Sequence, residues 1–222
     1  MSTRPGAELP PDPRPQVVFV HGLWMTGFEL WLLMHRVRRM GFRCHRLYYR
    51  SAIQPIWHNA AKLAQLVDSL GPGPVHIVAH SLGGLVTLRM LRDHPGVPAG
   101  RVVLIGSPVK GSGVAAQLNK RFWTRWMVWR AADEALVPHE PQDWRVRHPV
   151  GVIAGISGAR LGVGALLGGL KGPNDGTVMA EETRLDGAAD YIEFPLNHTT
   201  LLLTKRVARQ VAAFLRSGRF AR

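Results

Sequence analysis

The stretch VHIVAHSLGGLV, residues 75–86, decides the fold. Its first five residues are apolar apart from one histidine and have the composition of a buried strand. Apolar residues at helical spacing then predict a helix that begins directly after Ser81: Leu82, Leu85, Val86 and Met90. Ala79 and Gly83 stand two residues before and two residues after this serine. The stretch therefore predicts a strand, a sharp turn at Ser81 and a helix.

A strand that reverses into a helix within about three residues strains the backbone of the turn residue and crowds its neighbours. Only side chains as small as those of Gly or Ala fit at the two flanking positions. This small-x-Ser-x-Gly pattern is typical of a nucleophile elbow, which exposes the serine hydroxyl at the carboxyl edge of a sheet beside the first free N–H groups of a helix. A plain strand–turn–helix with an incidental serine is the alternative that the pattern alone leaves open.

Length and composition predict a water-soluble globular chain. The 222 residues are 46% hydrophobic, which suits one domain with a full core. No apolar run approaches the ~18 residues of a membrane span, and the N-terminal residues contain no apolar region typical of a signal peptide. The one cysteine, Cys44, fits a reducing compartment and is expected to be a small buried hydrophobe. We therefore expect a cytoplasmic location.

The chain is strongly basic, with 28 Lys and Arg against 15 Asp and Glu and a net charge of +13. Such a charge attracts anions, including nucleic acid, acidic lipid and acidic substrates. The basic residues are dispersed, and no nucleic-acid motif accompanies them. We therefore expect mostly solvated basic faces and no specific nucleic-acid binding.

Strand and helix patterns alternate about six times along the chain. Strands are predicted at 17–20, 44–49, 75–79, 102–105, 151–156 and 191–194, and helices at 28–40, 56–70, 82–94 and from His198 onward. This alternation predicts an α/β fold with an open, mostly parallel sheet of about six strands flanked by helices.

The predicted domain organisation has three parts. Proline-rich residues 1–16 are expected to form a flexible arm, and residues 17–222 a single domain. Within that domain the alternation lapses at about 111–149, where aromatic and cationic residues predict a short helical cap or lid.

A serine hydroxyl needs an adjacent base, best a histidine that a carboxylate holds in the right tautomer. Because ligands bind outside the carboxyl ends of parallel strands, these partners should follow later strands. Asp175 follows the fifth predicted strand and His198 the sixth. Other carboxylates compete with Asp175 for this role: Asp143, Asp186 and Asp190.

The other histidines are expected to have structural or solvated positions. We expect His76 to be a satisfied core or edge residue, His80 to face away from the site, and His139 and His148 to be solvated. No spacing resembles that of zinc ligands, so we expect neither a metal nor a cofactor.

Five segments in order make the chain resemble the α/β-hydrolase superfamily, specifically its small lipase and esterase members. The segments are His21-Gly22, residues 79–84 (AHSLGG), residues 106–112 (GSPVKGS), residues 174–178 (NDGTV) and residues 197–202 (NHTTLL). They extend from about Val17 to the C-terminus. In three respects the chain departs from the family: it has no counterpart of the first two strands of larger members, Ala79 stands where glycine is usual, and the insertion is short for a deep covered pocket.

The resemblance implies an α/β-hydrolase fold with Ser81 as nucleophile, His198 as base and Asp175 as its orienting acid. It also implies an oxyanion hole formed by the backbone N–H groups of Leu23 and Leu82, and a structural role for His21 in that turn.

We accordingly expect a serine hydrolase that cleaves carboxylic esters with a medium or long acyl chain, from a small molecule or a lipid. Trp24, Trp123 and Trp126 are expected to line the acyl site. The arginines among the tryptophans of the insertion could also contact an anionic membrane surface. An acyltransferase or thioesterase with the same triad remains open, as does a non-catalytic module that binds lipids or polyanions.

Overall fold

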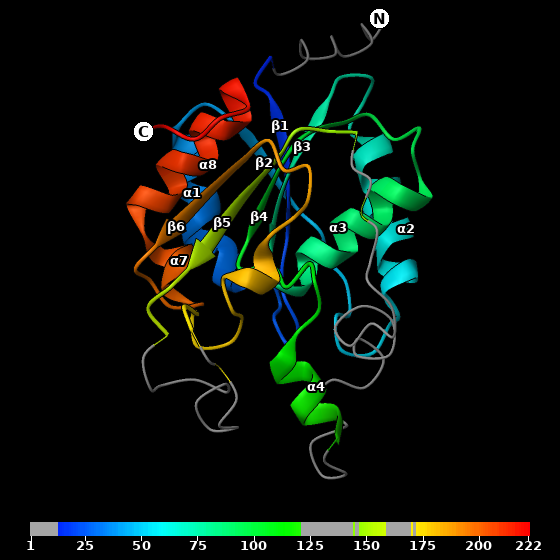
Figure 1. Ribbon diagram of the computed structural model, residues 1–222. Coiled ribbons are helices and arrows are strands. Elements are labelled where there is room, and N and C mark those ends of the chain that lie inside the picture. Colours follow the sequence, from blue (N-terminus) through cyan, green and yellow to red (C-terminus); the bar gives the residue numbers. More distant parts are fainter. Residues whose placement is uncertain (1–12, 121–143, 145–146, 159–169, 171) are drawn as a thin grey trace, which may run out of the picture.

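The computed structural model describes residues 13–120, 144, 147–158, 170 and 172–222. Within them, six parallel strands form one sheet with the order β2-β1-β3-β4-β5-β6 (Figure 1). The strands are β1 (Gln16–Val20), β2 (Arg43–Arg46), β3 (Val75–His80), β4 (Ala99–Ile105), β5 (Val150–Gly155) and β6 (Asp190–Phe194). The predicted fold class is thereby confirmed.

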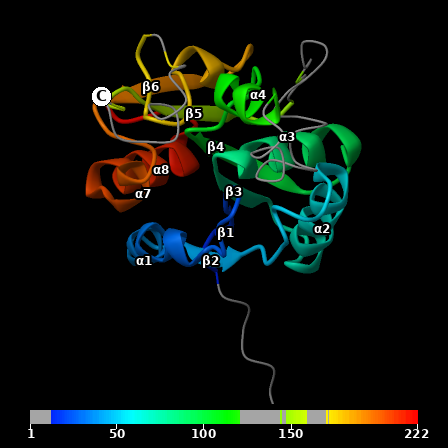
Figure 2. The ribbon, with the colours of Figure 1, turned by 90° about the horizontal axis from the view of Figure 1, so that it is seen from below.

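Helices cover both faces of the sheet. They are η1 (Phe28–Leu30), α1 (Trp31–Arg39), α2 (Ile56–Ser69), α3 (Leu82–Asp93), α4 (Gly113–Lys120), η3 (Glu181–Thr183), α7 (Thr200–Leu203) and α8 (Lys205–Ser217). Figure 2 looks onto the carboxyl edge of the sheet and shows α1, α7 and α8 on one side, with α2 and α3 on the other. None of the helices in the described ranges is long and apolar enough to cross a membrane.

Two apolar cores, one on each face, explain why the central strands are continuous apolar runs. Along β3, Ile77 and Ala79 pack into the core under α2 and α3, whereas Val78 packs into the core under α1 and α8. Successive side chains of a strand point to opposite faces, so a strand covered on both sides must be apolar at every position. Every residue of β3 is buried. The turn at Ser81 therefore begins where this buried strand ends.

Among the element boundaries that differ from the prediction are those of β2 and of the C-terminal helix. Strand β2 ends at Arg46, so Tyr49 lies in the connection to α2 rather than in the strand. The C-terminal helix is interrupted at Thr204, whose ψ of 131° is extended, and therefore consists of α7 and α8. His198 precedes α7 and lies in the loop after β6.

The predicted insertion is described only at its ends. Helix α4 begins at Gly113, but Trp123 and Trp126 lie outside the described residues, as do residues 1–12 of the predicted arm. The cap or lid and the division at residue 16 stay predictions, although β1 already begins at Gln16.

Candidate active site

Ser81 occupies the predicted sharp turn between β3 and α3, with φ 54° and ψ −126°. Positive φ is uncommon for a residue with a side chain and indicates backbone strain held by the surroundings. A Cβ atom at Gly83 would lie 2.5 Å from the carbonyl oxygens of both Val20 and His21. Glycine at 83 therefore allows the first turn of α3 to approach the end of β1.

Asp175 and His198 form a hydrogen-bonded pair. His198 Nδ1 lies 2.6 Å from Asp175 Oδ2, and the aspartate is buried. Asp175 Oδ1 accepts the backbone N–H groups of Thr177 (2.9 Å) and Val178 (2.8 Å), which fixes the carboxylate in its own turn. An ionised carboxylate can only accept, so in the neutral imidazole this bond places the proton on Nδ1 and leaves Nε2 unprotonated.

Three further contacts bring this pair to the Ser81 turn. The Ser81 N–H donates to the carbonyl of Ile105, 3.0 Å away, and Gly106 follows Ile105 at the end of β4. A Cβ atom at Gly106 would lie 3.1 Å from Asp175 Oδ2 and 3.2 Å from His198 Nδ1. The third contact comes from His80, the residue before Ser81. The turns that carry Ser81, Asp175 and His198 thus meet at one edge of the sheet.

The prediction that His80 faces away from the site is wrong. Its ring is fully buried and packs on the His198 ring, with centroids 4.5 Å apart. Its Nε2 lies 3.3 Å from the His198 carbonyl oxygen, which can only accept, so Nε2 carries the proton. Burial, and then the neighbouring His198, lowers the pKa of His80 well below its ordinary value. His80 is therefore neutral.

The turn after β1 lies against Ser81. A Cβ atom at Gly22 would lie 3.0 Å from Ser81 Cβ. His21 Nδ1–H donates to the Gly22 carbonyl (2.9 Å), and its ring stacks on Tyr49 with centroids 4.2 Å apart. The Tyr49 hydroxyl donates in turn to the His21 carbonyl. Tyr49 is a residue that sequence reasoning missed, because its contact depends on how the loop after β2 folds back.

Leu23 lies in the turn after β1, and Leu82 begins α3 directly after Ser81. Among the described residues, neither backbone N–H makes a hydrogen bond, and neither does the Ser81 hydroxyl, to His198 Nε2 or to any other group. A hydrogen bond between a serine hydroxyl and a neighbouring histidine often forms or shortens only when a substrate is bound. Trp24, the residue after Leu23, has φ 59° and is 55% exposed.

The competing residues lie elsewhere or outside the described ranges. Asp190 is at the start of β6, where it accepts the Phe220 N–H and pairs with Arg222, and Asp186 is exposed. His76 Nδ1 accepts the Arg101 N–H (2.9 Å), as expected of a satisfied core residue. The other two competitors, Asp143 and His139, lie outside the described residues. Within those residues no cluster of three or more His, Cys, Asp or Glu could hold a metal ion.

Glu182 is a second residue that the sequence did not indicate. Its carboxylate accepts the N–H groups of Gly113 (2.6 Å) and Met179 (2.9 Å), which joins the start of α4 to the loop that follows Asp175. Burial raises the pKa of Glu182. Cys44 is half-buried, and burial raises the pKa of its thiol to about 11, so the thiol is protonated.

Comparisons with known proteins agree with the fold. Residues 17–202 match the model of the "Alpha/beta hydrolase family". Similar solved structures include the mature lipase BlEst2 of Bacillus licheniformis (20% identity over 96% of both chains, TM-score 0.71). They also include the metagenomic carboxyl esterase MGS0156 (17%, 98% of this chain and 80% of that one, 0.64) and the carboxylesterase CesB of Bacillus subtilis (13%, 94% and 85%, 0.59). No curated protein sequence matches the chain. The chain belongs to the alpha/beta hydrolase family.

Proposed function

We propose that this hydrolase cleaves carboxylic esters through an acyl-enzyme on Ser81. The observation that carries the proposal is the 2.6 Å hydrogen bond between Asp175 and His198, next to a serine with strained backbone. The bond selects the histidine tautomer whose Nε2 can accept a proton. The similar structures of a lipase and two carboxylesterases add support from the fold.

In the acylation step, Ser81 Oγ attacks the carbonyl carbon of the ester while His198 Nε2 takes the hydroxyl proton. The buried Asp175 carboxylate stabilises the imidazolium that forms. The N–H groups of Leu23 and Leu82, neither of which has a partner among the described residues, would donate to the oxyanion, an effect of roughly 3–4 kcal/mol per donor. Collapse breaks the bond to the alcohol oxygen, which receives the proton from His198.

In the deacylation step, water attacks the acyl-enzyme and gives a proton to His198 Nε2. The bond to Ser81 Oγ breaks, the proton returns to the serine, and a carboxylic acid leaves. A medium or long acyl chain is the proposed preference. Its support is Trp24, which exposes an indole directly after Leu23, and the sequence positions of Trp123 and Trp126.

The test compares the wild-type protein with Ser81→Ala on p-nitrophenyl esters of increasing chain length. We expect the substitution to abolish hydrolysis without lowering the melting temperature, and a fluorophosphonate probe to label only the wild-type serine. Turnover that survives in folded Ser81→Ala would contradict the proposal. Folded wild-type protein that fails to label would favour a non-catalytic binding module.

Added alcohols test whether Ser81 serves acyl transfer instead of hydrolysis. If the acyl-enzyme passes its acyl group to an alcohol in preference to water, the products will be mainly new esters and the enzyme will be an acyltransferase. We expect free acid to predominate.

A further inference from the structure

Five large apolar side chains are exposed on neighbouring connections at the carboxyl edge of the sheet. They are Phe28 (72% exposed), Trp31 (57%), Tyr48 (72%), Ile53 (61%) and Trp57 (50%), and we call them the apolar rim. Phe28 and Trp31 follow β1, whereas Tyr48, Ile53 and Trp57 follow the edge strand β2. Single exposed apolar residues are normal, but a group at the first turns of η1, α1 and α2 and in the loop after β2 indicates an interaction site.

The side chain of Arg46 joins the two connections. Its guanidinium donates to the Tyr48 hydroxyl (2.6 Å) and lies 4.4 Å from the centroid of the tyrosine ring. A Cβ atom at Gly27 would lie 2.5 Å from Arg46 Cδ, so the arginine also packs against the loop that leads into Phe28. Arg46 thus links Tyr48, after β2, to the loop that leads into Phe28, after β1.

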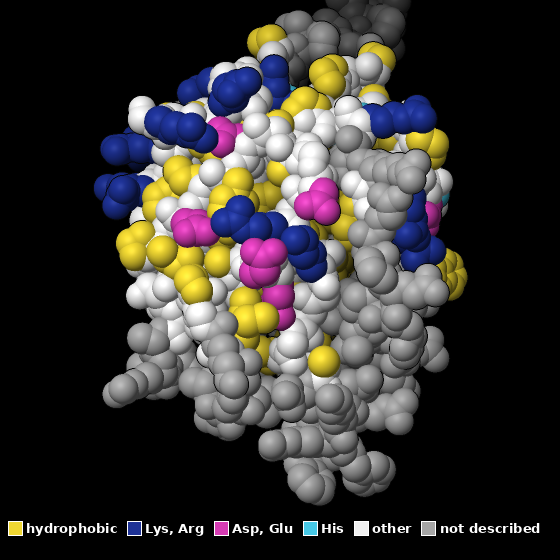
Figure 3. All heavy atoms as spheres, in the orientation of Figure 1, with side chains coloured by type: hydrophobic (Ala, Val, Ile, Leu, Met, Phe, Trp, Pro, Cys, Tyr) yellow, Lys and Arg dark blue, Asp and Glu magenta, His cyan; other side chains and the backbone are white. Residues whose placement is uncertain are grey.

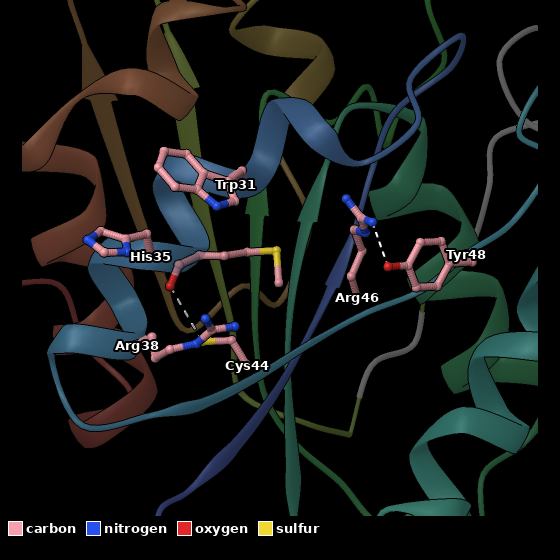
Figure 4. Close-up of a pocket in the computed structure, with 7 residues that line it drawn as sticks. Trp31, His35, Arg38, Cys44, Arg46 and Tyr48 are labelled. Atoms are coloured by element: carbon pink, nitrogen blue, oxygen red, sulfur yellow. Dashed lines mark hydrogen bonds between the residues drawn. The ribbon is translucent and has the colours of Figure 1, made fainter.

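A pocket of about 280 Å³ opens between α1 and β2 beside the rim (Figure 4). Its lining includes Trp31, His35, Arg38, Arg46 and Tyr48, and no carboxylate lines it. Among the described residues, the Arg38 guanidinium makes no ion pair. The pocket therefore offers a cation between aromatic walls.

Charge around the rim is almost entirely positive. Arg38 and Arg46 line the pocket, and Arg50 is exposed two residues after Tyr48, whereas the one acidic residue between residues 13 and 59 is Glu29. That carboxylate is engaged by the Gly27 N–H (3.0 Å). On the face shown in Figure 3, by contrast, acidic and basic side chains are interspersed, and Arg184 pairs with Glu181 and Glu193.

We propose that the apolar rim, with Arg38 and Arg50 beside it, is a docking surface for an anionic phospholipid bilayer. Aromatic and aliphatic side chains enter the interfacial region, and arginines bind lipid phosphates, so the two kinds of residue together fit this partner. A nucleic acid would stack on the rings and pair with the arginines, but it would gain nothing from the exposed aliphatic side chain of Ile53.

The apolar rim lies close to the turn that borders Ser81. Tyr49 follows Tyr48 and donates its hydroxyl to the His21 carbonyl, two residues before Leu23. A bilayer on the rim would thus lie next to the turn that borders Ser81. The proposal concerns binding, and it stands whether or not Ser81 is a nucleophile.

Binding is measured by co-sedimentation of Ser81→Ala protein with vesicles of phosphatidylcholine mixed with phosphatidylserine, and with vesicles of phosphatidylcholine alone. We expect binding to the mixed vesicles at low salt, lost at high salt. Phe28→Ser with Trp31→Ser should weaken it by about tenfold. Arg38→Glu with Arg50→Glu should weaken it by about tenfold or more, because each cation near an anionic surface contributes roughly fivefold.

Two control variants distinguish docking through the apolar rim from general electrostatic attraction between the basic protein and anionic vesicles. Arg219→Glu reverses a charge beyond the end of α8, at the opposite edge of the sheet, and should change binding by about twofold or less. Phe28→Trp keeps an aromatic ring in the rim and should retain binding. Every rim variant should keep its melting temperature and, with Ser81 restored, the wild-type rate on a soluble short-chain ester.

Three outcomes would overturn the proposal: equal binding to both kinds of vesicle, an effect of Arg219→Glu as large as that of Arg38→Glu with Arg50→Glu, or tighter binding to duplex DNA than to vesicles. Vesicle binding without esterase activity would leave the docking surface standing and remove only the proposed catalysis. Ester hydrolysis without vesicle binding would support the proposed catalysis and remove the docking surface.

Discussion

The imidazole of His80 packs against that of His198, with ring centroids 4.5 Å apart and ring planes at 47°. One histidine ends the strand that leads into Ser81, and the other lies in the loop after β6. His80 also donates to the His198 backbone carbonyl, so it holds both the ring and the main chain of that loop. Since His80 is neutral, it acts as a rigid spacer and adds no charge beside the Asp175–His198 pair.

We therefore predict that His80 is a positioning residue for the proposed base. His80→Ala should lower kcat by about 10–100-fold and change KM little, because the loss is one of alignment between Ser81 and His198. His80→Phe keeps a packing ring without the hydrogen bond and should recover part of the rate. Steady-state kinetics on a short-chain p-nitrophenyl ester provide both constants, and a purely structural role would instead lower the melting temperature and the fraction of active enzyme.

Asp175→Asn separates the two functions of the carboxylate. The amide oxygen can still accept the N–H groups of Thr177 and Val178, whereas the amide nitrogen would donate to His198 Nδ1. The imidazole would then hold its proton on Nε2 and could no longer accept one from Ser81. We expect kcat to fall by about 10³–10⁴-fold with the fold intact.

The tautomer itself can be observed. Nitrogen NMR of His198 should show the proton on Nδ1 in the wild type and on Nε2 in Asp175→Asn. Near wild-type turnover of Asp175→Asn would remove the aspartate from the proposed triad.

Gly83→Ala tests the close approach of α3 to β1. The added Cβ would meet two backbone carbonyl oxygens at 2.5 Å, and neither can move without shifting β1. We expect the free energy of unfolding to fall by about 1–3 kcal/mol, together with a loss of activity as the Ser81 turn shifts. Gly96→Ala is the matched control, since a Cβ there meets nothing within 4 Å. Equal urea midpoints for the two variants would contradict the packing argument.

The sequence predicted the sheet well because its strands have two buried faces. A continuous apolar run identified β1, β3, β4 and β5 without knowledge of their partners, and a helical pattern follows this run after β1 and β3. It located Ser81, Asp175 and His198 because strand ends of a parallel sheet meet at one edge. These are local patterns whose consequence in space follows from one topological rule.

Contacts between loops could not be predicted in this way. His80 was placed only as the residue next to Ser81, and its position in the sequence cannot show that the loop after β6 returns to cover its ring. Tyr49 and Glu182 act through connections whose course depends on turns without a sequence period. The apolar rim was missed for the same reason, since Phe28, Ile53 and Trp57 belong to different elements that follow β1 and β2.

The lowered pKa of His76 predicts how the free energy of unfolding depends on pH. Burial, and then the neighbouring Arg101, lowers the pKa of His76 from 6.5 to about 4 in the folded chain. Between these values the unfolded chain binds a proton that the folded chain does not, so stability decreases as pH falls. Protonation would also remove the acceptor for the Arg101 N–H. His76→Asn keeps an acceptor oxygen near the Nδ1 position but does not titrate.

We expect wild type and His76→Asn to unfold at similar urea concentrations at neutral pH. As pH falls through the window from 6.5 to about 4, the wild type should lose about 2–3 kcal/mol more stability than the variant. Burial also lowers the pKa of His21 and His80, so part of the acid sensitivity should remain in His76→Asn. Parallel stability curves for the two proteins would mean that His76 is already protonated in the folded chain. The short contact between its Nδ1 and the Arg101 N–H argues against that, because a protonated ring has no lone pair to accept it.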